Sequence, residues 1–494
     1  MAGCATRAGD ELKTEDAIVE LRELRDDVAS LRDAVLRQGE ARLLEWGATG
    51  EGASNLAYYL ALRSHDLLAL QLRLAAYGLS SLGRSEADVM PALDALLATL
   101  CRLCGEQAEY PPLAAMRAGE DALNRSCDRM FGESTAARRT RIMVTLPSEA
   151  AADLGLVSAL LDAGMDCARI NCAHDDAVAW SQMVDNVRAA SRRLGRTCKV
   201  MMDIAGPKLR IEAVHAPEKY RLHLGERLRL APRLDQRSGP LAFSLNFPQV
   251  IAQLRCGSEV SFDDGKATGR VVAVDKEGAE LEIIAARAKG LRLKPAKGVN
   301  FPSIDLELSS LTSKDLGDLD FVARSADLVG FSFVQRVEDV MQLQAELAAR
   351  RGEKPAQTLV LKIETPLAIR NLPRLIVQSA ARHPTAVMIA RGDLAVEVGF
   401  ARLSEMQEEI LWLCEAAHAP VIWATQVLDQ LVHEGVASRA ETTDAAMAQR
   451  ADCVMLNKGD YLPQGVRFLQ DVLVRMERHH SKKFARLAKL HAWS

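Results

Sequence analysis

The chain lacks any apolar run long enough to cross a membrane, and no signal peptide is evident in residues 1–11. It also lacks a strong charge of either sign, since 62 Lys and Arg stand against 66 Asp and Glu, for a formal net charge of −4. This balance gives no support for bulk attraction to nucleic acid or to a membrane. These absences predict a cytoplasmic protein with neither kind of partner.

A disulfide framework is not expected either, because the ten cysteines are scattered along 494 residues. One CxxC motif, Cys101 with Cys104, has no second CxxC and no paired histidines, which disfavours a zinc site. The motif lies in a helical Leu/Ala pattern, so two buried helix cysteines are favoured over a redox pair. The chain is too long for one ordinary core, and roughly two to four domains are expected.

Residues 1–137 are predicted to form an all-α N-terminal extension. Its first helix carries a seam of apolar residues at three-four spacing: Leu21, Leu24, Val28, Leu31 and Val35. Further amphipathic helices are expected over residues 56–76 and 86–103, with Ser85 as the N-cap of the second. Such helices need a partner surface, so the extension serves either as a dimerisation or docking element or as a cap that shields the next domain.

From Arg139 onward, short apolar runs of β type alternate with helical segments. There are eight such runs, at residues 141–146, 167–171, 199–204, 327–333, 359–364, 386–390, 420–425 and 452–457. Eight β-α units in series predict an α/β protein with a closed (β/α)₈ TIM barrel over residues 138–208 and 298–465.

A long insertion, residues 209–297, follows the third run. It is rich in Val, Leu and Arg, with turn signals at residues 224–226, 263–265 and 276–278, which predicts a small all-β domain. A final amphipathic, basic helix is predicted over residues 466–494.

Polar residues gather where the predicted strands end, and in such barrels these ends meet at one face. They are Arg169 and Asn171, Asp203, Ser332, Lys362 and Glu364, the run Arg391, Gly392 and Asp393, then Thr425, and finally Asn457 and Lys458. For Asn171, Ser332 and Thr425 taken singly, a structural role in barrel layers or caps is an equal alternative.

Lys362 and Glu364 are the most informative pair, because side chains two apart in a strand project to the same side. A buried charged pair costs several kcal/mol without compensation, so a core strand has no reason to carry one unless chemistry uses it. Glu364 with Asp393 predicts a carboxylate pair for a hard divalent cation, with Lys362 beside it.

The motifs of residues 139–465 resemble those of the pyruvate kinase family, and they occur in the family's order. The matching segments are residues 167–175, 201–210, 262–265, 297–315, 332–336, 361–365, 390–397, 424–430 and 438–446. The resemblance implies a barrel capped by a mobile small β-barrel lid, with phosphoenolpyruvate bound between them. It also implies the reaction of phosphoenolpyruvate with ADP to give pyruvate and ATP, with Mg²⁺ or Mn²⁺ as the metal.

Residue by residue, the resemblance implies that Glu364 and Asp393 hold the metal. The implied catalytic residues are Lys362, Thr425 and Arg169, and the implied substrate-binding residues are Arg169, Ser332, Lys362, Gly392, Asp393 and Thr425. The implied nucleotide-binding residues are Pro147, Asn171, His174, Arg210 and Lys297. Asp264 and Lys297 belong to the lid that closes over the site.

Several departures from the family pattern affect the expected activity. The family's potassium site has a serine at the position of Ala173, and the usual glutamate is Lys208. Asn171, Asp203 and Lys208 then form a region in which an ammonium replaces potassium, as in potassium-independent members, although a surface lysine is the alternative. Thr145 and Pro147 flank a single residue, so a glycine of the first-strand motif is lost.

Further departures lie near the end of the barrel. The loop at residues 457–460 replaces a Ser-Gly-Glu-Thr sequence thought to relay a proton. The family's C-terminal α/β domain, with its effector site, is expected to be absent. Two other functions therefore stay open: a catalytically impaired binding or regulatory protein, and a metal-dependent enolpyruvate or 2-oxo acid enzyme that does not use ADP. A homo-oligomer formed through the barrel or the N-terminal helices is compatible with each.

Overall fold

The computed structural model describes residues 3–134, 137–235 and 238–485, with side chains from residue 17 onward. Its internal contacts divide the chain into two units, Met1–Arg129 with Ile410–Pro420, and Met130–Glu409 with Val421–Ser494. Within the described ranges, no helix has both the length and the apolar character that a membrane crossing requires.

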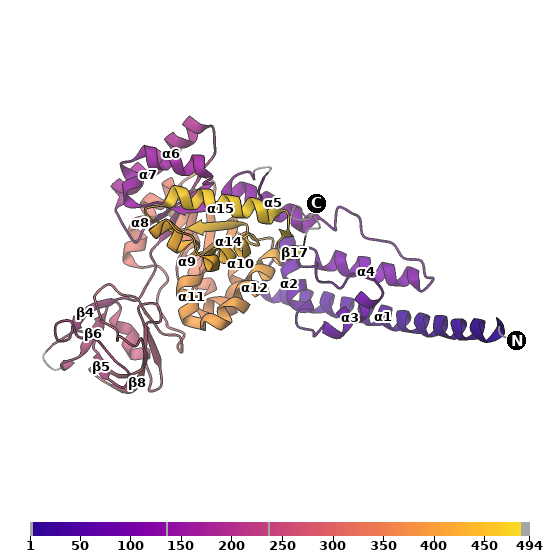
Figure 1. The fold of residues 1–494 in the computed structure, drawn as a ribbon, viewed down its shortest axis with the longest axis horizontal. Coiled ribbons are helices and arrows are strands. Elements are labelled where there is room, and N and C mark those ends of the chain that lie inside the picture. Colours follow the sequence, from indigo (N-terminus) through magenta and orange to yellow (C-terminus); the bar gives the residue numbers. More distant parts are fainter. Residues whose placement is uncertain (1–2, 135–136, 236–237, 486–494) are drawn as a thin grey trace. The chain divides into compact units, whose positions relative to one another are not determined.

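The first unit is helical, as the sequence predicts (Figure 1). It holds α1 (Gly3–Trp46), α2 (Glu51–Leu62), α3 (Leu68–Ala76), α4 (Val89–Leu103) and most of α5 (Ala118–Phe131). Leu24, Val28 and Val35 of the predicted seam are fully buried, on a helix that packs against α2 and α4. Leu31 is buried as well and Leu21 is half-buried, so the periodicity of α1 reports its packing face correctly.

Two details of the predicted helices are wrong. Residues 56–76 form two helices rather than one, because α2 ends at Leu62 and α3 begins at Leu68. Ser85 does not cap α4, which begins only at Val89, and its hydroxyl donates instead to the Leu82 carbonyl at 2.7 Å. The side chain of Asn55 accepts from the Val89 N–H at 2.8 Å, so the cap comes from another helix and leaves no local sequence signal.

The predicted burial of Cys101 and Cys104 is also incorrect, since both are half-buried.

The second unit contains the predicted barrel of eight parallel strands, which is confirmed. In chain order the strands are β1 (Arg141–Thr145), β2 (Cys167–Asn171), β3 (Lys199–Ile204), β11 (Leu328–Phe331), β12 (Thr358–Ile363), β13 (Thr385–Ala390), β14 (Val421–Ala424) and β15 (Cys453–Leu456). The barrel closes in the order β1-β15-β14-β13-β12-β11-β3-β2. Parallel strands covered on both faces read as continuous apolar runs, which explains why the sequence marks them clearly.

Helices follow the barrel strands. They are α6 (Leu154–Ala163), α7 (Ala177–Leu194), α8 (Ser313–Ser325), α9 (Val337–Arg351), α10 (Pro366–Ala380), α11 (Arg391–Val398), α12 (Phe400–Ala416), α13 (Asp429–Glu434), α14 (Arg439–Ala448) and α15 (Leu462–Glu477). Most of these helices carry a buried stripe toward the strands and an exposed face, as a barrel's outer layer requires.

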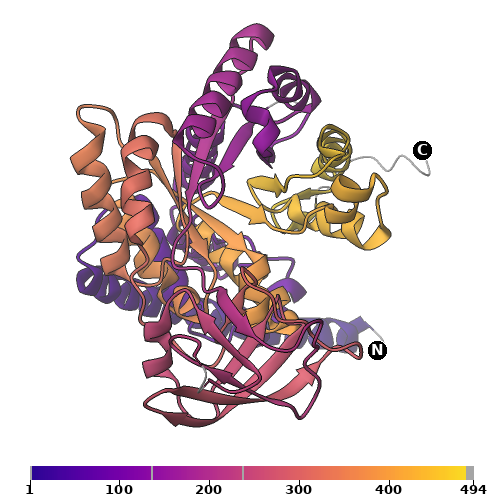
Figure 2. The same cartoon turned by 90° about the vertical axis from the view of Figure 1, so that its left-hand side faces the viewer.

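The insertion folds as seven strands that we call the inserted sheet, seen as a separate group of strands in magenta to pink in Figure 2. It comprises β4 (Ile211–His215), β5 (Arg227–Leu230), β6 (Ala242–Leu245), β7 (Glu259–Phe262), β8 (Ala267–Asp275), β9 (Gly278–Ala286) and β10 (Val299–Asn300). The residues just before its edge strands β4 and β10, Arg210 and Gly298, form an isolated β-bridge, so the sheet is nearly closed. The chain enters and leaves the inserted sheet side by side at this bridge.

The predicted C-terminal helix over residues 466–494 is wrong in extent. Helix α15 spans Leu462–Glu477 and packs against α6 and α14, so it is the last helix of the barrel. A short hairpin of β16 (His480–Ser481) and β17 (Phe484–Ala485) follows. Residues 486–494 of that prediction lie outside the described residues.

The hairpin is fastened to the barrel by a buried ion pair at Asp452, whose side chain is 1% exposed. Asp452 accepts from Lys482 Nζ at 2.6 Å and from the Val421 N–H at 2.9 Å, and Arg139 Nη1 lies 3.5 Å away. Burial alone would raise the pKa of Asp452, but the charges of Lys482 and Arg139 more than offset it and hold the pKa below its ordinary value.

Asp452→Asn should lower the free energy of unfolding by about 3 kcal/mol at neutral pH, because it leaves two cations without their carboxylate. Chemical denaturation would measure this loss. Since the folded-state pKa of Asp452 lies below the unfolded one, its stabilisation is complete above about pH 4 and disappears as the pH falls through the folded value. The difference between wild type and variant should therefore shrink in acid.

Asp471→Asn is the matched control, because the ion pair of Asp471 with Arg475 is exposed and should contribute almost nothing. Equal stability of the Asp452 and Asp471 variants would show that the hairpin's ion pair does not stabilise the barrel.

Candidate active site

A buried carboxylate shared by two cations lies at the carboxyl ends of the barrel strands. Asp203 lies near the carboxyl end of β3. Its carboxylate accepts from Arg169 of β2, through Nε at 2.9 Å and through Nη2. Lys362 Nζ of β12 lies 3.1 Å from the other oxygen of the same carboxylate. Burial alone would raise the pKa of Asp203, but Lys362 and Arg169 together lower it below the ordinary value. Asp203 is therefore ionised at neutral pH.

Lys362 is held as a cation by its surroundings. Burial alone would lower its pKa, but the carboxylates of Asp203 and Glu364 more than compensate and raise it. The Ser332 hydroxyl accepts from Lys362 Nζ at 2.6 Å and donates to the Ile204 carbonyl at 2.6 Å. Ser332, which is 2% exposed, thus orients the ammonium as well as lying in the predicted site.

The loop after β3 reaches Ser332 only because it contains a glycine. Gly206 has a φ of +65°, and a Cβ there would stand 3.0 Å from both the Cβ and the carbonyl oxygen of Ser332. Asp315 in the first turn of α8 accepts from the backbone N–H groups of Ala205 and Gly206 at 2.9 and 3.3 Å. Together these contacts set the course of the chain toward Lys208.

The predicted carboxylates directly follow two neighbouring strands, β12 and β13. Lys362 Nζ lies 3.3 Å from Glu364 Oε1, so the two side chains do project to the same side. Glu364 is 3% exposed and accepts from the Phe333 N–H at 2.6 Å. Burial raises the pKa of Glu364, Lys362 opposes this, and the negative charge of Asp393 adds to the rise. Asp393 itself lies in the first turn of α11, directly after β13, which pairs with β12.

Two neighbouring carboxylates fit a divalent cation that takes its other ligands from substrate and water. Mg²⁺ is usually bound in this way, by one or two carboxylates together with substrate oxygens. Across the part of the chain that the structure describes, no cluster of three or more His, Cys, Asp or Glu forms a complete protein cage. A cation at Glu364 and Asp393 would also relieve the repulsion between the two carboxylates.

The turn after β14 carries backbone strain. Thr425 and Gln426 have φ values of 68° and 56°, which non-glycine residues rarely adopt and which gather at functional sites. Thr425 Oγ1 accepts from the Gly392 N–H at 2.8 Å and donates to the Ala424 carbonyl at 2.7 Å. Arg391 also fixes this turn, since its guanidinium donates to the carbonyls of Ala424 and Thr425 at 3.0 and 2.7 Å.

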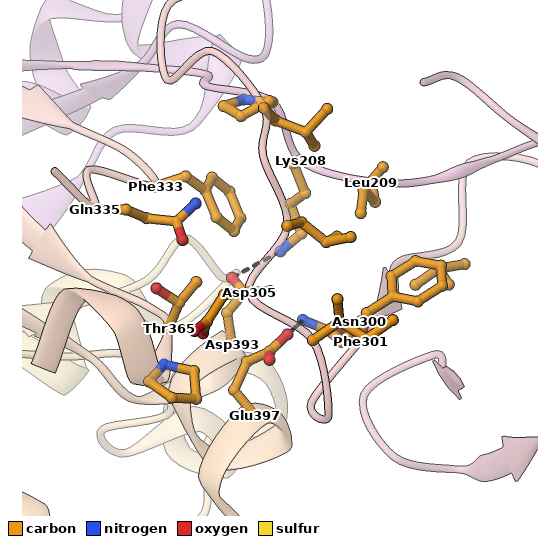
Figure 3. A pocket seen from close by; sticks show the side chains of 16 residues that line it. Lys208, Leu209, Asn300, Phe301, Asp305, Phe333, Gln335, Thr365, Asp393 and Glu397 are labelled. Atoms are coloured by element: carbon orange, nitrogen blue, oxygen red, sulfur yellow. Dashed lines mark hydrogen bonds and ion pairs between the residues drawn. The ribbon is translucent and has the colours of Figure 1, made fainter. Parts of the chain in front are cut away.

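Lys208 is placed differently from the predicted monovalent-cation region. Its Nζ donates to Asp393 Oδ2 at 2.9 Å (Figure 3). Asn171 instead accepts from the Ala173 N–H at 3.1 Å, and the Asp203 carboxylate is taken by Arg169 and Lys362. The ammonium of Lys208 therefore stands beside a predicted metal ligand rather than between Asn171 and Asp203.

A cleft of ≈ 770 Å³ opens between the barrel and the inserted sheet. Four basic side chains contribute to its lining: His174, Lys208, Arg210 and Lys314. Burial, with nearby Lys458 as a further cause, lowers the pKa of His174, so that this imidazole is neutral at pH 7. His174 and Arg210 thus line one cleft.

The other predicted nucleotide-side residues lie outside the lining described for this cleft. Pro147 precedes a short 3₁₀ helix, Ser148–Ala151, at the end of β1. Lys297 forms an ion pair with Asp263 at 3.1 Å. Asp263, Asp264 and Gly265 make the turn after β7 with φ values of 49°, 57° and 79°, at a position that the sequence predicts as a turn.

Two polar residues near Asp393 were missed by sequence reasoning. Asn300 of β10 donates through Nδ2 to Glu397 Oε1 of α11 at 3.0 Å, in a cavity of ≈ 50 Å³ (Figure 3). Burial raises the pKa of Glu397 to about 7, and the charge of Asp393 adds to the rise. A signal was present, since residues four apart on a helix share a face and Glu397 follows Asp393 by four.

Comparisons with known proteins give a family match and several similar relatives. The model of the family described as "Pyruvate kinase, barrel domain" matches residues 137–464. Pyruvate kinases of Geobacillus stearothermophilus and Agrobacterium vitis are each 30% identical over 349 residues, which are 69% of this chain and 57% and 70% of the respective relative. A pyruvate kinase of Dictyostelium discoideum is 28% identical over 342 residues, 68% of this chain and 65% of the relative.

The chain thus spans little more than half the length of the relative from Geobacillus stearothermophilus. The match nevertheless covers all eight barrel strands, the inserted sheet and the polar residues at the strand ends. Because the family model matches well over half of the chain, this protein belongs to the pyruvate kinase family.

Proposed function

We propose that the protein transfers the phosphoryl group of phosphoenolpyruvate to ADP, giving pyruvate and ATP, in a magnesium-dependent reaction. The observation that carries this proposal is the buried arrangement of Lys362 and Arg169 on Asp203, beside the carboxylates of Glu364 and Asp393. It joins two fixed positive charges and an oxygen-donor pair at the rim where barrel enzymes place their chemistry.

Arg169 is suited to the substrate phosphate. Its guanidinium has five N–H donors, of which three are engaged by Asp203 and Thr145. Two donors remain, and a planar fork of this kind matches phosphate oxygens. Asp203 and Thr145 keep the fork from turning away, so little order is lost when phosphate binds.

Lys362 is suited to the charge that develops during transfer. Its ammonium is fixed by Asp203, Ser332 and Glu364 before substrate arrives, so no reorganisation is needed in the transition state. A divalent cation held by Glu364 and Asp393 would supply further positive charge and align the phosphate and carboxylate oxygens. In this proposal Thr425, whose hydroxyl accepts from the Gly392 N–H at the start of α11, passes a proton to the enolate carbon.

The cleft of ≈ 770 Å³ is the proposed ADP site. Arg210, Lys208 and Lys314 line it with positive charge, which suits a diphosphate. His174 is neutral there and acts as a hydrogen-bond partner. The inserted sheet acts as the lid, and the turn at Asp264 excludes water on closing.

A coupled assay for pyruvate tests the activity. Pyruvate should form only with phosphoenolpyruvate, ADP and Mg²⁺ together. Pyruvate without nucleotide would instead identify an enolpyruvate enzyme that does not use ADP. Binding of phosphoenolpyruvate without any pyruvate would identify a binding protein that has lost turnover.

Lys362→Met should lower kcat by roughly 100-fold or more, because a preorganised charge opposite the developing negative charge is removed. Mn²⁺ binding to the variant, followed by electron paramagnetic resonance, should stay largely intact, since Glu364 and Asp393 remain. Lys276→Met, at an exposed turn of the inserted sheet, is the matched control and should behave as wild type. Normal turnover by the Lys362 variant would refute the site assignment.

Potassium should not be required, because Lys208 supplies a fixed positive charge 2.9 Å from Asp393. The rate at constant ionic strength should be the same in sodium and in potassium chloride. Lys208→Met should lower the rate and make it respond to potassium. A many-fold rise of the wild-type rate on exchanging sodium for potassium would contradict this.

A further inference from the structure

Helix α11 is tied to both ends of the inserted sheet. Asp393 and Glu397 lie four residues apart on the same face of this helix. Asp393 accepts from Lys208, on the segment that enters the inserted sheet, and Glu397 accepts from Asn300, on the strand that leaves it. Figure 3 shows the side chains of Lys208 and Asn300 directed toward those of Asp393 and Glu397. One short helix therefore carries a proposed metal ligand and contacts both segments that connect the proposed lid to the barrel.

The contact between Asn300 and Glu397 is part-buried, and the Glu397 carboxyl has a second donor. Asn300 is 8% exposed, and the backbone N–H of Phe301 also donates to the Glu397 carboxyl. Phe301 and Pro366 give the small cavity apolar walls. Hydrogen bonds partly shielded from water are stronger than fully exposed ones.

The contact leads directly to the turn proposed to close over the site. Asn300 and Val299 pair with Ser261 and Phe262 of β7. The next residue after Phe262 is Asp263, which forms ion pairs with Lys266 at 2.7 Å and Lys297 at 3.1 Å. A change in the orientation of β10 at Asn300 would thus shift the paired residues of β7 and, with them, this turn.

We propose that Glu397 is a positioning residue that sets the orientation of the inserted sheet over the active site through its hydrogen bond to Asn300. This inference rests on the proposed phosphoryl transfer and deepens it. Glu397 touches no substrate in this proposal and acts only by holding β10 against the helix that carries Asp393. The requirement is a hydrogen-bond acceptor of this length at residue 397, whether or not it is charged.

The decisive comparison is Glu397→Gln with Glu397→Leu. The Gln variant keeps an oxygen acceptor of the same length for Asn300 and should retain kcat/KM for ADP within about twofold. The Leu variant fills similar space without an acceptor and should lose about 10- to 100-fold in kcat/KM, because small misplacements of positioned groups cost this much. Most of that loss should be a raised KM for ADP, because the lid closes the nucleotide side.

A second measurement does not depend on activity. Trypsin cleavage at the linkers, at Lys208, Arg210 or Lys297, should be several-fold faster in Glu397→Leu than in wild type and unchanged in Glu397→Gln. Asn300→Asp, which sets two carboxyls against each other, should also speed cleavage. Glu218→Leu, at a highly exposed position of the inserted sheet, is the control and should change neither measurement.

The outcomes separate this inference from the proposed function. A wild-type protein without pyruvate formation but with the expected order of cleavage rates would contradict only the proposed reaction. An active wild type whose Glu397→Leu variant matches it in KM and cleavage rate would overturn the positioning role. Equal defects in the Gln and Leu variants would also overturn it, since they would trace the effect to charge or folding rather than to the bond with Asn300.

Discussion

The candidate site depends on one buried interaction, the Asp203 carboxylate shared between Arg169 and Lys362. Two cations cannot be kept apart from water at the centre of a barrel rim unless an anion compensates them. Asp203 provides this compensation and is itself kept ionised by them. The cost of burying three charges is thereby reduced. The two N–H groups of Arg169 that neither Asp203 nor Thr145 engages are held in a fixed orientation.

The rest of the site follows from the order of the strands in the barrel. β3 pairs with both β2 and β11, and β11 pairs with β12, so Asp203 stands near residues from either side. Ser332, at the end of β11, lies between Asp203 and Lys362 and contacts both. Glu364 and Asp393 then follow the next two strands around the barrel, β12 and β13. Parallel pairing aligns all these ends at one face, so residues far apart in sequence become neighbours.

The inserted sheet adds a second constraint, because its two linkers lie side by side and are both bonded to α11. The helix that presents Gly392 and Asp393 is therefore also the point of attachment of the proposed lid. The proposed transfer needs water excluded and would gain from this arrangement, since the proposed lid and the proposed metal ligand are held by the same element.

Much of this architecture is readable from local patterns. The eight apolar runs predicted the eight strands because parallel strands covered on both faces must be continuously apolar. Alternation placed Lys362 and Glu364 on one side, and the structure confirms it. The periodicity of α1 likewise predicted the burial of Leu24 and Val28. The helix over residues 466–494 was predicted too long because an amphipathic pattern does not reveal that Lys482 bends back to Asp452.

By itself, the sequence determined the barrel, the position of the insertion and the set of polar residues at the strand ends, because periodicity and turn chemistry act over a few neighbouring residues. Only the tertiary structure decided which of those residues contact one another. Asp203 pairs with two cations. Lys208 bonds to Asp393 rather than lying near Asn171, and Asn300 donates a hydrogen bond to Glu397. Each of these contacts spans tens of residues or more in the chain, and its energy depends on burial and on the approach of a distant charge, neither of which a local pattern records.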